Sequence, residues 1–204
     1  MKKIVITGCL GYIGSELCKL YSGLSWKYEI IGIDNRFVSE RVNELKRRKI
    51  KFVQADILNL SEIKEQIQDA DIVHHLAGIT DVAYVKKDSD KDRDDRIKKV
   101  AIDGTKNVID SMNDNAKIIF PSTHVVFEGL KEPRENIDES EKTETFLAYS
   151  SSKVHNENQI INSGKKYAIF RLGSVYGFST DTMRINIMPN LFSKIASQNG
   201  TIKL

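Results

Sequence analysis

The sequence predicts an α/β fold in which helices cover both faces of a doubly wound parallel sheet. Six short runs rich in Ile, Val and Phe recur along the chain, and each is too continuously apolar to keep one face in water. Helical patterns fill the intervals between these runs. Strand–helix alternation of this kind favours parallel strands joined by right-handed crossovers. The length of 204 residues suits one such domain, with part of a second.

The expected strands and helices alternate from the N-terminus onward. We expect strands at residues 3–7, 28–34, 50–56, 71–77, 116–122 and 167–173. We expect helices near residues 12–22, 38–48, 61–68, 94–113 and 149–163. Two polar stretches interrupt this alternation. Residues 86–99 are almost all charged and predict a solvated loop that runs into a helix, whereas residues 128–146 lack periodicity and predict a long loop, which in a compact domain is usually functional.

Composition and charge exclude several classes of protein. Hydrophobic residues make up 40% of the chain, and 31 basic residues are nearly balanced by 28 acidic ones. The two signs alternate, so we expect no binding to nucleic acid or to an anionic membrane. The chain has no apolar run long enough to span a bilayer, and glycines interrupt its apolar start, which does not fit a signal peptide. With only Cys9 and Cys18, a disulfide framework is excluded, and a cytoplasmic location is expected.

A glycine-rich segment, "TGCLGYIG", lies between the first expected strand and the first expected helix. Gly8 allows a tight turn, Gly11 lets the backbone approach a pyrophosphate, and Gly14 permits close helix–strand packing. The helix N-terminus, at Tyr12 and Ile13, offers N–H groups and a dipole to the anion. The segment predicts a Rossmann-like dinucleotide site, in which Cys9 is interpreted as a small filler.

An acidic residue follows at the spacing expected for the adenine ribose. Asp34 closes the second expected strand twenty residues after Gly14, with Asn35 next to it. A carboxylate there accepts hydrogen bonds from ribose hydroxyls and repels a 2′-phosphate, so the sequence favours NAD over NADP. Arg36 leaves this choice open, because an arginine nearby can accommodate that phosphate.

The segment "AYSSSKVHNE" places Tyr149 and Lys153 four residues apart. On a helix this spacing brings both side chains to one face. They could form a solvent-facing pair with no chemical role. Alternatively, the lysine ammonium could lower the pKa of the phenol and make it a base.

Several segments together resemble the NAD-dependent nucleotide-sugar epimerase/dehydratase family of extended short-chain dehydrogenases/reductases. In chain order these are "TGCLGYIG", "DIVHHLAG", "DGTKNVI", "STHVVFEG", "YSSSK" and "RLGSVYG". The resemblance implies further cofactor contacts from Asp56, Ile57, Leu76, Ala77 and Gly78. It also implies that Lys153 holds the nicotinamide ribose.

The resemblance makes Tyr149 the acid–base residue and adds Thr123 as a hydroxyl that hydrogen-bonds the substrate. It implies substrate contacts for Ser174 and for His124, although His124 could equally fill space. Ser174 stands where the family usually has asparagine, as does Ala101. His124 and Val125 occupy positions that are acidic in the family's dehydratases, which argues against dehydration.

No metal site is expected. His74 and His75 are adjacent on a predicted strand, so their side chains point to opposite faces of the sheet and cannot chelate one ion together.

The resemblance implies NAD-dependent epimerisation of a nucleotide-activated sugar at C4 through a transient keto sugar. Two alternatives stay open, a nucleotide-sugar reductase or dehydrogenase and a non-catalytic dinucleotide-binding protein. Family members pair through a helix bundle, which would use residues 94–113 and 149–163, although the apolar residues there could equally face the sheet.

Two domains are expected, a dinucleotide-binding domain at residues 1–177 and the start of a truncated substrate-binding region at 178–204. The latter resembles the family's helix and strand that lead into that region. We expect the parent protein to be longer and this chain to turn over sugar poorly.

Overall fold

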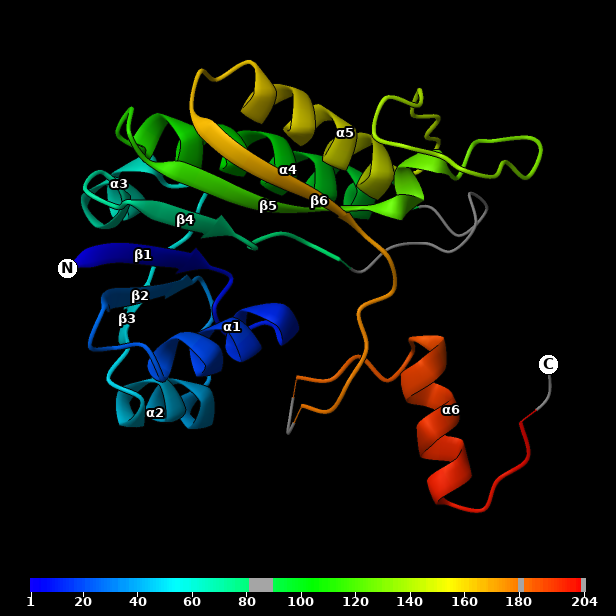
Figure 1. Ribbon diagram of the computed structural model, residues 1–204, viewed down its shortest axis with the longest axis horizontal. Helices are drawn as coiled ribbons and strands as arrows, with labels where there is room; N and C mark the ends of the chain where they lie inside the picture. The colour runs from blue at the N-terminus through cyan, green and yellow to red at the C-terminus, as the bar shows by residue number, and fades with distance from the viewer. Residues whose placement is uncertain (81–89, 180–181, 203–204) are drawn as a thin grey trace.

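A computed structural model of the chain describes residues 1–80, 90–179 and 182–202, and its core is one parallel sheet (Figure 1). The six strands are ordered β3-β2-β1-β4-β5-β6, and each neighbouring pair is parallel. Their bounds are β1 (Lys2–Thr7), β2 (Tyr28–Asp34), β3 (Lys51–Gln54), β4 (Ile72–His75), β5 (Lys117–Thr123) and β6 (Lys166–Leu172). The predicted doubly wound parallel sheet is confirmed.

Helices cover both faces of this sheet (Figure 1). The α-helices are α1 (Tyr12–Ser22), α2 (Ser39–Arg47), α3 (Leu60–Ile67), α4 (Lys91–Ser111), α5 (Ala148–Ile161) and α6 (Met188–Ser197). Helices α1 and α2 pack on one face, and α3, α4 and α5 pack on the other. Helix α6 lies apart from both layers. No helix in the described ranges is both long and apolar enough to cross a membrane.

Alternating strand residues divide the core into two clusters. Val5 of β1 packs with α3, α4 and α5, whereas Ile4 and Ile6 pack with α1 and α2. Three apolar residues of α4 belong to the first cluster, since Val108 is buried there and Val100 and Ile109 pack against it. Of the two alternatives left open by the sequence, these residues therefore face the sheet.

The structure differs from the prediction at the two least periodic places. Helix α4 begins at Lys91, three residues earlier than expected, because the Asp90 carboxylate caps it by accepting from the Arg93 N–H at 2.9 Å. Residues 86–89 of the expected loop lie outside the described residues. At the C-terminus, residues 201–202 form no strand, and residues 203–204 lie outside the described part.

The stretch from 128 to 147 contains no helix or strand, as predicted. Its two ends are joined, because the Gly129 N–H donates to the Glu144 carbonyl at 2.8 Å and the Glu144 N–H donates to the Val126 carbonyl at 3.0 Å. The loop therefore leaves and rejoins the sheet edge at one point, between β5 and α5.

We expect Gly14→Ala to lower the free energy of unfolding by about 1–3 kcal/mol, the usual cost of overpacking. A Cβ at Gly14 would lie 2.2 Å from the Gly8 carbonyl oxygen, and backbone cannot yield as a side-chain tip can. Gly23→Ala on the same helix is the control, because Gly23 has φ −68° and its Cβ would lie 3.5 Å from the nearest atom. Urea unfolding measures both variants; equal stabilities would contradict the close packing.

Candidate active site

The glycine-rich loop lies against the backbone that follows β4, at the point where the strand order reverses. Gly8 has φ +71°, and a Cβ there would lie 2.8 Å from the Ala77 nitrogen. The loop therefore has no room for side chains at Gly8 and Gly14. Gly11 precedes the first turn of α1 as its N-cap, without a side-chain cap of its own. This cradle fits a dinucleotide pyrophosphate, because backbone N–H groups at a helix start bind anions.

Asp34 lies at the end of β2 and is 5% exposed. One carboxylate oxygen accepts from the Leu10 N–H at 3.0 Å, which ties the strand to the glycine-rich loop. The Arg36 side chain pairs with both oxygens, Nε to Oδ1 at 3.0 Å and Nη2 to Oδ2 at 3.3 Å. This pairing raises the pKa of Arg36. Asp34 is therefore already fully engaged within the protein.

The other predicted cofactor residues gather along the same edge of the sheet. The Asn35 amide donates to the Asp56 carboxylate at 3.1 Å, so these two side chains meet at the ends of β2 and β3. Ile57 is buried in the core. The N–H groups of Leu76 and Ala77 donate to the Thr7 carbonyl and hydroxyl, both at 3.2 Å. Two further predicted cofactor residues differ in exposure. Gly78, which follows Ala77, is exposed, and Ile13, in the first turn of α1, is half-buried.

Tyr12, at the start of α1, points to the segment that follows β6. Its hydroxyl donates to the Gly177 carbonyl, and Ser15 hydrogen-bonds with Thr182 at 3.2 Å. The segment after β6 thus returns to the mouth of the glycine-rich loop.

Thr123, Tyr149 and Lys153 meet where β5 ends and α5 begins. Thr123 is the last residue of β5; its hydroxyl oxygen accepts from the Val125 N–H at 3.2 Å, and its side chain lowers the pKa of the Tyr149 phenol. The Lys153 ammonium lies 5.8 Å from the centre of the Tyr149 ring and 4.3 Å from that of Phe120. It donates to the Pro121 carbonyl at 2.7 Å. Both side chains are half-buried against the end of β5, so the pair does not face solvent alone, and its chemical role stays a prediction.

The electrostatics of Tyr149 differ from the expectation. Burial raises the pKa of the phenol, and this outweighs the lowering by the Arg184 charge and by the hydrogen bond with Thr123. The expected lowering by a neighbouring ammonium is wrong for the chain as it stands. The reason is that desolvation disfavours a buried phenolate, while the lysine is directed to a carbonyl and an aromatic ring.

Burial also lowers the pKa of Lys153 to about 8, against an opposing effect of the Glu157 carboxylate. Glu157 is itself buried, accepts from the Ser122 hydroxyl, and pairs with Arg171 at 2.8 Å. The sequence analysis missed this cluster. Two signals pointed to it, since Glu157 follows Lys153 by one helical turn and Arg171 interrupts an apolar strand.

Glu128 is a second residue that the sequence analysis missed. One of its carboxylate oxygens accepts from the N–H groups of Phe146 and Leu147, at 3.1 and 2.9 Å, and from the Ser150 hydroxyl. Helix α5 has no side-chain cap from its own N-cap residue, Leu147. Glu128 therefore caps the helix that carries Tyr149, from the far end of the loop.

The two adjacent histidines point to opposite faces, as predicted. His74 hydrogen-bonds with Tyr21 of α1 at 2.8 Å, whereas His75 bridges Thr7 at 2.9 Å and Thr105 of α4 at 3.0 Å. Burial lowers the pKa of His74 to about 4 and that of His75 to about 3. Both rings are therefore neutral structural links. Across the described residues, no three His, Cys, Asp or Glu side chains cluster in a way that could hold a metal.

The two departures from the family pattern have different outcomes. The carbonyl of Ala101 lies 3.2 Å from the Asn156 side-chain nitrogen, when that amide is oriented to satisfy its neighbours. An asparagine of α5 thus contacts the backbone at this position. Ser174 is exposed in the segment after β6, and His124 is exposed with its Nδ1 3.0 Å from the Leu172 carbonyl. Their roles in substrate binding stay predictions.

The predicted filler role of Cys9 fits its surroundings. Its side chain is fully buried, and a Cβ at Gly32 would lie 2.8 Å from its sulfur. Burial raises the pKa of the thiol far above its usual range, so it stays protonated.

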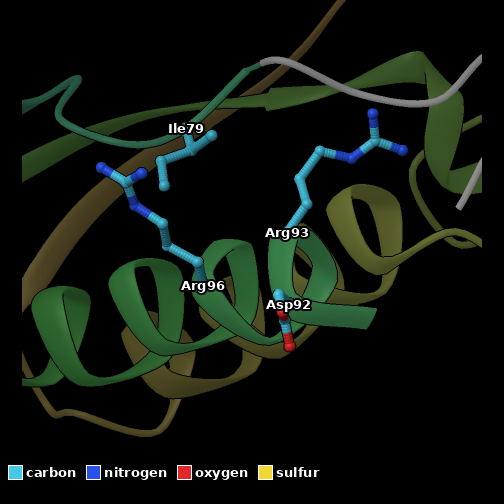
Figure 2. Close-up of a pocket in the computed structure, with 4 residues that line it drawn as sticks. All are labelled: Ile79, Asp92, Arg93 and Arg96. Atoms are coloured by element: carbon cyan, nitrogen blue, oxygen red, sulfur yellow. The ribbon is translucent and has the colours of Figure 1, made fainter. Parts of the chain in front are cut away.

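A pocket of about 340 Å³ opens beside the predicted cofactor edge, between Ile79 and the first turns of α4 (Figure 2). Asp92, Arg93 and Arg96 complete its lining, and the two guanidinium groups extend on either side of Ile79. Two cations at one opening favour anionic ligands.

Comparison with known proteins identifies relatives of this chain. The sequence matches the NAD dependent epimerase/dehydratase family over residues 4–204. A dTDP-D-glucose 4,6-dehydratase from Dictyostelium discoideum is 30% identical over 199 residues, which cover 87% of this chain and 44% of that protein. The uncharacterized protein 052L of Frog virus 3 is 31% identical over 110 residues, which cover 53% of this chain and 29% of that protein.

Solved structures share the fold. The UDP-glucuronic acid 4-epimerase of Bacillus cereus, in complex with UDP-glucuronic acid and NAD, matches with a TM-score of 0.75 and 24% identity over 97% of this chain and 64% of its own. The UDP-glucose 4-epimerase of Thermotoga maritima, with UDP-glucose, matches with a TM-score of 0.79 and 21% identity over 99% of this chain and 65% of its own. This chain thus spans less than two thirds of each of these relatives. Because the family match extends over nearly all of its residues, the chain belongs to the NAD dependent epimerase/dehydratase family.

Proposed function

We propose that this chain binds NAD and belongs to an enzyme that epimerises a nucleotide-activated sugar at C4. The observation that carries the proposal is the meeting of Thr123, Tyr149 and Lys153 at the sheet edge that also holds the glycine-rich cradle. Nucleotide sugars are the ligands named for the solved relatives. The substrate and the reaction are proposed for this chain because it spans only part of their length.

The residues divide the chemistry among them. Tyr149 takes a proton from the sugar hydroxyl and returns it at the end, as a general base and then a general acid. Thr123, whose side chain acts on the Tyr149 phenol, holds the reacting sugar oxygen. When bound, NAD supplies the acceptor for the hydride of the same carbon. Lys153 keeps a positive charge beside the phenol and holds the nicotinamide ribose.

The residues after Thr123 favour epimerisation over dehydration. His124 and Val125 begin the short 3-10 helix η2 (His124–Phe127), and neither is an acid. A 4,6-dehydratase needs an acid–base group at a second carbon of the sugar. A reductase or dehydrogenase, with net hydride transfer, and a non-catalytic dinucleotide-binding protein are the alternatives that the experiments below separate.

The expected homodimer and cytoplasmic location are part of the same proposal. Helices α4 and α5 lie side by side on one face of the sheet, as a shared helix bundle requires (Figure 1). Because the apolar residues of α4 face the sheet, its pairing surface is polar. Sedimentation at several concentrations tests this pairing.

In a complete, active form of the protein, we expect Tyr149→Phe to leave NADH binding nearly unchanged and to reduce turnover by about 10²–10⁴-fold, because it removes only the acid–base hydroxyl. Turnover is measured as C4 inversion of UDP-, dTDP- and GDP-sugars. Tyr167→Phe is the control, since Tyr167 is an exposed residue of the edge strand β6.

The outcomes separate the three functions. Turnover within a few-fold of the unaltered chain would contradict the role of Tyr149. Net formation of NADH with a sugar would favour the dehydrogenase. Dinucleotide binding by the complete form of the protein without any turnover would favour the non-catalytic alternative.

We expect Glu128→Ala to cost about 0.5–2 kcal/mol of stability, as the loss of a helix cap does, and to reduce turnover about tenfold to hundredfold. The reason is that Tyr149 is the second residue of α5 and moves when the first turn frays. Glu128→Gln retains an acceptor oxygen and should restore most of the turnover.

Glu141→Ala is the matched control, because it removes a carboxylate that pairs with Arg134 at 2.6 Å in the same loop. Urea unfolding and initial rates measure all three variants. If Glu128→Ala behaves like Glu141→Ala in both, Glu128 does not position Tyr149.

A further inference from the structure

We propose that Arg36 gives the dinucleotide site a place for a 2′-phosphate, so that the site accepts NADP as well as NAD. This inference rests on the proposed dinucleotide binding and on no step of the reaction. It concerns the residue that sets cofactor choice, for which the sequence favours NAD through Asp34, with Arg36 as the argument for NADP.

The first observation is that the Asp34 carboxylate already has hydrogen-bond partners within the protein. In a site that selects NAD, the carboxylate at the end of the second strand is available to ribose hydroxyls. Here its oxygens already accept four hydrogen bonds, from the N–H of Leu10 and from the N–H, Nε and Nη2 of Arg36. A ribose must therefore displace Arg36 to reach the carboxylate fully.

The second observation is the difference in exposure between the side chains of Asp34 and Arg36. The Asp34 side chain is 4% exposed, whereas the Arg36 side chain is 54% exposed. The guanidinium thus lies on the solvent side of the carboxylate, where a ligand enters. A ligand that approaches this corner meets a cation with donors in a planar fork, the geometry that suits a phosphate.

The third observation is the net charge of the side chains around Asp34. A lone carboxylate repels a 2′-phosphate, and this repulsion is what excludes NADP. Arg36 neutralises Asp34. Arg41 adds a second guanidinium at the same loop, because its Nη1 donates to the Leu10 carbonyl at 2.8 Å. Another acid on this edge, Asp56, is held by the Asn35 amide and by the Leu58 N–H at 2.9 Å.

The test is a pair of binding titrations with NADH and NADPH, followed by nucleotide fluorescence at low and fixed ionic strength. In Arg36→Leu we expect the ratio of the NADPH to the NADH dissociation constant to rise about tenfold or more, because a charge-assisted phosphate contact is lost and Asp34 is uncovered. Arg47→Leu is the control, since Arg47 is an exposed arginine of α2 paired with Glu44 at 2.7 Å. It should leave the ratio unchanged.

A smaller rise in the ratio would overturn the inference, as would an equal weakening of both nucleotides, which indicates that Arg36 contacts the adenine instead. If the unaltered chain binds NADH but not NADPH, the inference fails while the proposed cofactor site stands. If it binds neither nucleotide, the proposed function fails too. Raising the salt concentration should weaken NADPH more than NADH, because phosphate contacts with exposed charges are screened.

Discussion

The alignment of the whole cofactor edge depends on close backbone packing at two glycines, Gly8 and Gly14. A Cβ at Gly8 would meet the Ala77 nitrogen at 2.8 Å, and one at Gly14 would meet the Gly8 carbonyl at 2.2 Å. These two contacts fix α1 to the ends of β1 and β4 without any side chain between them. The Leu10 N–H then falls within 3.0 Å of Asp34 on β2, so three strands and a helix end are aligned together.

The other half of the site is held by carboxylates instead of backbone packing. Glu128 binds the first turn of α5, and Glu157, two turns further along, binds Ser122 of β5 and Arg171 of β6. Tyr149 and Lys153 lie between these two anchors. Truncating one partner of such a buried pair leaves an uncompensated charge, which is costly. The helix therefore has little freedom to slide along β5, which keeps Tyr149 beside the end of that strand.

Local patterns explain how much of this could be predicted from the sequence. Apolar runs predicted the parallel sheet covered by helices, and glycine spacing predicted the cradle, because each depends on residues that are neighbours in the chain. Glu128 gave no such signal, since its partners follow 18 to 22 residues later across an aperiodic loop. The start of α4 was missed because an almost wholly charged stretch has no apolar period. The pKa of Tyr149 was predicted with the wrong sign because it depends on burial, which spacing alone does not reveal.

The charges around Tyr149 determine whether its phenol acts as an acid or as a base. With its pKa raised by burial, the phenol is protonated at neutral pH and can act at once as an acid. Lys153, with a pKa of about 8, is still mostly charged at pH 7, and the Glu157 carboxylate in the next helical turn favours this charged form. Arg171 in turn neutralises Glu157. Because burial outweighs the lowering of the Tyr149 pKa by the Arg184 charge and by Thr123, the phenolate needs a further positive charge close by. A cationic group bound beside Tyr149 would therefore turn it from an acid into a base.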